Sequence, residues 1–171
     1  MINDGYWRLE LFFQRCIISF WCFINQCFYS SHNEHRISRG ILYSAVIVRK
    51  MIEDDKDVHS AARQYKMIEP NLVAMRYKVP VWMVPFIGES EVVGYRFVAS
   101  NYDYSNAKNV KYDLNIICNK IIHSSLWSIV YEDKRVNSIA FSSDKEKTTE
   151  AYVVRIKDWL DMLKHVSEEW A

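Results

Sequence analysis

The sequence predicts an α+β protein that is mainly helical, a single domain over residues 1–171 built as a four-helix bundle with two β-hairpin insertions. Glycine and proline together supply only seven of the 171 residues, whereas a typical domain contains about 12% of them. Half of the residues are hydrophobic, and long stretches repeat apolar side chains at helical spacing. Two segments alternate like strands, so a mixed sheet built from both hairpins is the alternative fold.

The first two helices are predicted to form an antiparallel hairpin. Residues 6–31 carry apolar side chains on two adjacent helical faces. A helix of that kind is buried on both sides or lies between partners. A polar linker over 30–36 precedes a second helix over 38–65, with Ser38 as its N-cap.

Strand-like and helical segments alternate over the rest of the chain. Residues 72–99 are rich in β-branched and aromatic side chains around a turn at Gly88, which predicts a hairpin whose first strand is kept at a sheet edge by proline. Residues 110–131 predict a third helix. Residues 135–156 predict the second hairpin, and residues 158–170 the last helix.

Charge and cysteine usage predict a cytoplasmic protein without cofactor or metal. The net charge is only +1, and the chain contains neither a Gly-rich phosphate-binding loop nor a C-x-x-C pair. The N-terminal residues lack the pattern of a secretory signal, so we expect reduced thiols. The uncharged stretch 16–33 has a strongly apolar run of nine residues, whereas a membrane span needs ~20. We therefore expect no association with a membrane.

A polar stripe stands out on the predicted third helix. Asn119 and His123 are four residues apart and therefore project from the same side of an otherwise apolar helix. Imidazole titrates near neutral pH and can act as a general acid or base. The alternative is structural, because a lone histidine on a helix is usually exposed or hydrogen-bonded.

This Asn-x-x-x-His pattern resembles the HEPN superfamily, whose motif is Arg, a polar residue, three variable residues and His on a late helix of a bundle. Cys118 stands where that Arg would be. The resemblance implies a HEPN-like bundle that dimerises, and a metal-independent endoribonuclease where the motif is intact. His123 would then be the general acid or base, and the Arg would hold the phosphate.

A cation from elsewhere could replace the missing Arg. Arg49, on the second helix, is the better candidate, with Glu53 and Tyr43 around the same pocket, although Arg49 and Glu53 could also be an ordinary surface ion pair. Lys120 is adjacent to Asn119 but points about 100° away from it.

Three functions remain open from the sequence. The favoured one is a HEPN-like module without an intact catalytic motif, a homodimer that binds a protein or RNA partner in a prokaryotic defence or toxin system. The second is the endoribonuclease with His123, Asn119 and Arg49. The third is nucleic-acid binding through aromatic and basic residues of the first hairpin, namely Tyr77, Trp82 and Arg96.

Overall fold

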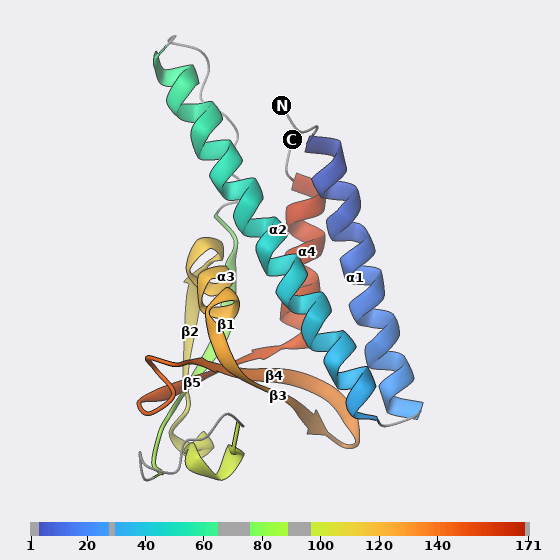
Figure 1. The fold of residues 1–171 in the computed structure, drawn as a ribbon, viewed down its shortest axis with the longest axis vertical. Coiled ribbons are helices and arrows are strands. Elements are labelled where there is room, and N and C mark those ends of the chain that lie inside the picture. Colours follow the sequence, from blue (N-terminus) through green and yellow to red (C-terminus); the bar gives the residue numbers. More distant parts are fainter. Residues whose placement is uncertain (1–3, 28–29, 65–75, 89–96, 170–171) are drawn as a thin grey trace.

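The computed structural model describes residues 4–27, 30–64, 76–88 and 97–169. A five-stranded antiparallel sheet in the order β2-β1-β5-β4-β3 supports a layer of helices (Figure 1). The elements are α1 (Asp4–Cys27), α2 (Ser31–Gln64), β1 (Lys78–Pro85), β2 (Lys108–Asp113), α3 (Leu114–Ile122), β3 (Ser124–Glu132), β4 (Arg135–Ser143), β5 (Glu150–Arg155) and α4 (Ile156–Glu169). The four-helix bundle with two hairpin insertions is therefore wrong, because all five strands belong to one sheet.

The predicted third helix over 110–131 is the largest error. That segment contains the end of β2, the nine-residue helix α3 and most of β3. Its flanks are rich in β-branched and aromatic residues, which favour strands, and no glycine or proline marks the two boundaries. The scarcity of turn residues did not exclude a sheet, because the β3–β4 turn is made by Asp133 and Lys134 with φ of 49° and 62°.

The predicted first hairpin over 72–99 is also wrong. β1 lies between β2 and β5, so it is not an edge strand. Pro80 is tolerated because β1 pairs with β5 only from Trp82 to Pro85. Residues 72–75 and 89–96 of this prediction lie outside the described residues, and Phe97 and Val98 belong to no strand.

The predicted second hairpin is present as a pair of strands within the sheet. β4 and β5 pair antiparallel, with Ile139 opposite Val154 and Phe141 opposite Tyr152. Both strands are buried on their two faces, with Ile139 and Tyr152 facing the large core and Ala140 and Val153 facing a smaller one. They are central strands of the fold and not an insertion.

The helical hairpin of α1 and α2 is confirmed, with one boundary corrected. α2 begins at Ser31 and not at Ser38. The hydroxyl oxygen of Ser30 accepts a hydrogen bond from the backbone N–H of Asn33 at 3.2 Å, which caps the helix. Residues 31–36, predicted as linker, therefore form the first turns of α2.

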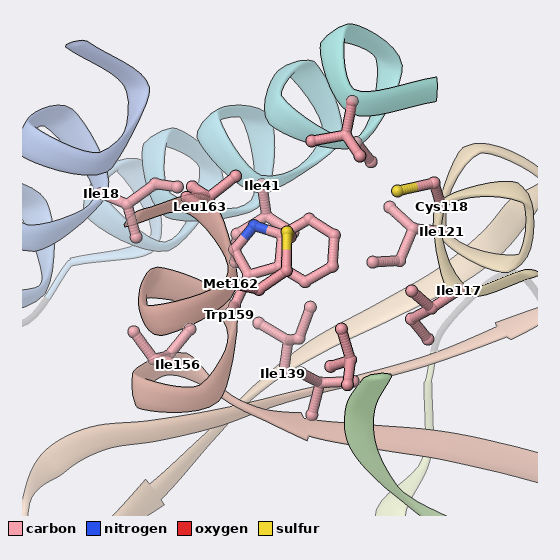
Figure 2. Close-up of a cluster of buried hydrophobic side chains, with 14 of the residues drawn as sticks. Ile18, Ile41, Ile117, Cys118, Ile121, Ile139, Ile156, Trp159, Met162 and Leu163 are labelled. Atoms are coloured by element: carbon pink, nitrogen blue, oxygen red, sulfur yellow. The ribbon is translucent and has the colours of Figure 1, made fainter. Parts of the chain in front are cut away.

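The large core lies between the helices and the face of the sheet that they cover (Figure 2). Trp159 of α4 is at its centre and is fully buried, and its indole N–H donates to the hydroxyl of Ser44 at 2.9 Å. Ile117, Cys118 and Ile121 bring α3 into the same core (Figure 2). This packing fixes α3 against α2, and with it the polar residues on the outer side of α3.

Candidate functional site

The predicted site residues Arg49 and Asn119 are brought together at the contact of α2 with α3. The Nη1 of Arg49 donates a hydrogen bond to the Oδ1 of Asn119. The Nε of Arg49 donates to the Oε1 of Glu53 at 2.8 Å. About a third of the Arg49 side chain remains exposed, so the guanidinium is oriented by two partners and still borders solvent.

His123 lies at the end of α3 and not within a long helix. It is the C-cap residue, and its backbone N–H donates to the carbonyl of Asn119 at 3.0 Å. Its side chain is exposed and lines a pocket of about 460 Å³ together with Asn119, Lys120 and residues 143–146, at the end of β4 and the start of the β4–β5 loop. Within the described part of the chain, the imidazole makes no hydrogen bond, and Asn119 and His123 line one pocket although the long helix predicted to carry them is absent.

Lys120 is held by neighbouring side chains and not presented to solvent. Its Nζ lies 2.7 Å from the Oε1 of Glu146 and 2.6 Å from the hydroxyl of Tyr152. It also lies 4.0 Å from the centroid of the Tyr152 ring. The ammonium is therefore committed to a polar cluster under the pocket, and its predicted contact with a phosphate would require it to leave these partners.

The contacts among Lys120, Glu146 and Tyr152 shift the pKa values of Glu146 and Tyr152 in opposite directions. Burial would raise the pKa of Glu146, but hydrogen bonds from Lys120, Ser143 and Tyr152 lower it below the usual range. Burial raises the pKa of Tyr152, and hydrogen bonding to Glu150 and Glu146 raises it further. The cluster therefore holds a charged carboxylate and a neutral phenol at neutral pH.

Cys118 cannot take the place of the family's Arg. Its side chain is fully buried among Ile117 and Ile121, pointing into the core (Figure 2). Burial raises the pKa of its thiol, and the charge of Arg49 lowers it only in part. It is a small core residue without a thiolate at neutral pH.

The remaining predicted residues do not gather at this site. Tyr43 lies in a different pocket, between α1 and α2, so its predicted place beside Arg49 is wrong. Tyr77 packs against His165 with ring centroids 4.8 Å apart, on the side of the large core. Trp82 packs against the smaller core on the opposite face of the sheet, and Arg96 lies outside the described residues.

One surface was not recognised as exposed from the sequence. The outer side of α1 carries a row of aromatic and aliphatic side chains that are 40–62% exposed, which we call the α1 apolar surface: Tyr6, Leu9, Phe12, Phe13, Ile17, Phe20 and Phe23. The opposite side of α1 is buried through Leu11, Ile18 and Cys22. Both apolar faces predicted for this helix therefore contribute to its exposed side, and the buried side is neither of them.

Comparison of the chain with known proteins found no relative. No family model, curated protein or solved structure matches the chain. Among the described helices, none has the length and apolar character that crossing a bilayer requires. Across the described residues, no three His, Cys, Asp or Glu side chains are grouped as metal ligands.

Proposed function

We propose that this protein is a self-associating module in which a second copy covers the α1 apolar surface. The observation that carries the proposal is the exposure of seven large apolar side chains on one side of one helix. Water-exposed apolar surface is unfavourable, and large contiguous patches mark interaction sites.

The size of the surface supports a second copy as its occupant. With ~150–250 Å² for each aromatic side chain, the seven residues expose roughly 700 Å². The largest patch on a typical monomer is ~300–600 Å², and each partner in a standard interface buries about 800 Å².

Arg15 borders this surface, with its guanidinium 5.9 Å from the centroid of the Phe12 ring, whereas Arg8 and Glu10 are engaged elsewhere. Arg8 turns toward α4, where its Nε donates to the carbonyl oxygen of Ser167 at 2.8 Å. Glu10 accepts a hydrogen bond from Gln14 at 2.9 Å, on the side that faces α2. A mainly apolar surface of this kind suits a two-fold dimer, in which the same patch serves both copies.

The test is sedimentation velocity over a range of protein concentrations. We expect the wild-type chain to dimerise and the Phe13→Glu and Phe20→Glu variants to stay monomeric, because each places a charge in the interface. Ile87→Glu is the matched control, since Ile87 is 64% exposed outside α1, and it should dimerise like the wild type. A wild-type chain that remains monomeric at every concentration would refute the proposal.

A second candidate function is metal-independent cleavage of RNA, favoured because Arg49 contacts Asn119 and Asn119 lines one pocket with His123. The HEPN resemblance supplies the chemistry. His123 would take the proton of a ribose 2′-OH, the 2′-oxygen would bond to the adjacent phosphorus, and the 5′-oxygen would leave and take up a proton. Arg49 would hold the phosphate oxygens while negative charge builds on them.

Cleavage and self-association can be tested separately. α2 contacts both α1 and α3 and lies between them (Figure 1), so a dimer through α1 keeps the two copies of His123 apart. We expect cellular RNA incubated with EDTA to yield 2′,3′-cyclic phosphate ends with the wild-type chain and with His165→Ala, but not with His123→Ala. Cleavage that is absent, or unchanged in His123→Ala, would eliminate this candidate without affecting the dimer.

A further inference from the structure

A basic groove between α1 and the first turns of α2 is separate from the site of Arg49 and His123. Its pocket of about 260 Å³ is lined by four basic side chains, two aromatic ones and no acidic one: Gln14, Ile17, Trp21, His32, His35, Arg36, Arg39, Gly40 and Tyr43. Residues 32, 35, 36 and 39 share one side of α2, because they follow the three- and four-residue spacing of a helix. The helices approach closely here, since a Cβ on Gly40 would lie 2.8 Å from the Cγ1 of Ile18.

The two arginines of the groove are held by aromatic rings and not by carboxylates. The guanidinium of Arg36 lies 4.6 Å from the centroid of Trp21, and its Nε donates to the Nε2 of His32 at 2.8 Å. The guanidinium of Arg39 lies 5.1 Å from the centroid of Tyr43 and donates to its hydroxyl at 2.8 Å. Both planes are therefore oriented, while several of their N–H donors have no partner among the residues that the structure describes.

The charge of these arginines is not compensated, in contrast to that of other cations. Arg49, Lys120 and Arg155 each have a carboxylate within 2.8 Å. Neither Arg36 nor Arg39 has a carboxylate partner among the described residues. Oriented and unpaired guanidinium groups are suited to phosphate, which their planar donors match.

The basic groove continues across α2 into a second pocket. His35 and Arg39 also line a space of about 380 Å³ against Trp127 and the following residues of β3. Glu34 borders this space, but its carboxylate accepts a hydrogen bond from Tyr131 at 2.7 Å. Because His35 and Arg39 line both pockets, the pockets adjoin, and together they form a path with Trp21 and Tyr43 on one side of these residues and Trp127 on the other.

We propose that this path binds single-stranded nucleic acid, with Arg36 and Arg39 on its phosphates and bases stacked on the aromatic rings that border it. Proteins that bind single strands combine a basic groove with aromatic side chains in this way. The first pocket is smaller than the ~300–1,000 Å³ that encloses a small-molecule ligand. A path that is open and continues past one nucleotide therefore fits a chain better than a free nucleotide.

The test is fluorescence anisotropy of a labelled twelve-residue oligouridine titrated with the intact protein at several salt concentrations. We expect Arg36→Gln and Arg39→Gln each to weaken binding on the order of tenfold and to lower the slope of log K against log salt by about 0.7. Arg155→Gln is the matched control, because Arg155 also lies over an indole, Trp82, but is paired with Asp158. It should leave binding unchanged.

Competition with unlabelled AMP and with the unlabelled oligonucleotide distinguishes a mononucleotide pocket from a site for a nucleic-acid strand. Unlabelled AMP should fail to displace the oligonucleotide at concentrations where the unlabelled oligonucleotide does so. Displacement by AMP at equal concentration would assign a mononucleotide pocket and overturn the extended path. Absence of oligonucleotide binding at 50 mM salt would overturn the inference altogether, as would a loss of binding in Arg155→Gln equal to that in Arg36→Gln. A monomeric Phe20→Glu variant that still binds the oligonucleotide would support the path as independent of the dimer.

Discussion

Replacing Cys118 by arginine tests whether this position belongs to a site or to the core. The substitution would restore the Arg of the HEPN motif in the sequence. In the structure the Cys118 side chain is fully buried and packs with Ile117 and Ile121. A guanidinium at this position has to enter the core or push α3 away from α2, and no Asp or Glu is among the buried residues of the described part of the chain.

The expected loss exceeds what the fold can tolerate. Burying an unpaired ion costs several kcal/mol after relaxation, and a typical domain is stable by only ~5–15 kcal/mol. The positive charge of Arg49 acts on the Cys118 thiol, so repulsion between two cations adds to the cost. Cys118→Ala removes only the sulfur and should cost roughly 1–2 kcal/mol through the small cavity it leaves.

Urea denaturation followed by circular dichroism at 222 nm compares the three proteins. We expect cooperative unfolding of the wild type and of Cys118→Ala, and little or no folded baseline for Cys118→Arg. A Cys118→Arg variant that unfolds within about 1 kcal/mol of the wild type would refute the reasoning, because α3 would then present position 118 to solvent.

Three further substitutions probe other parts of the structure. Ser44→Ala leaves the buried indole N–H of Trp159 without its acceptor, which should cost ~1–3 kcal/mol in urea unfolding. Gly40→Ala puts a Cβ against Ile18, so we expect a loss of ~1–3 kcal/mol, with non-additivity in combination with Ile18→Ala. Glu146 has a pKa below its ordinary 4.5 in the folded state, so its contribution is complete above 4.5 and is lost as pH falls through the lower value. Glu146→Gln should therefore reduce the fall in urea midpoint between pH 6 and pH 3.

Long periodic elements were predictable and short adjoining ones were not. The helices α1, α2 and α4 show the helical spacing over many turns, and the alternation in β4 and β5 indicated their pairing. The boundaries of α3 were missed because no glycine or proline marks them. The chain changes from strand to helix at Asp113 and from helix to strand at His123. The helical spacing is present at Leu114, Ile117 and Ile121. The prediction extended that helix into the flanking strands.

The candidate site was predictable only where local spacing determines it. Asn119 lies in the last turn of α3 and His123 is its C-cap, so their closeness followed from the sequence, and Arg49 was found because it is a cation on an apolar stretch. The position of Tyr43 depends on which side of α2 faces α1. The engagement of Lys120 depends on Glu146 and Tyr152, which the sheet brings from 26 and 32 residues away.

The exposure of α1 could not be deduced from its sequence, because an apolar helix face looks the same whether the chain or a partner covers it. The sequence left both readings open. The fold decides between them, since α1 is at the edge of the helical layer and only its inner side meets α2 and α4 (Figure 1).

An intermolecular distance across α1 tests self-association most directly. A nitroxide on Ser19→Cys, at the border of the α1 apolar surface, can be introduced after replacing Cys16 and Cys27 by alanine. Because packed helix axes lie 8–10 Å apart, pulsed electron paramagnetic resonance should show a distance below about 30 Å between the two copies. The same label on Lys145→Cys, in the β4–β5 loop beyond α3, should give a longer distance. An absence of intermolecular coupling at position 19 in the fully labelled protein would contradict the proposal that a second copy covers α1.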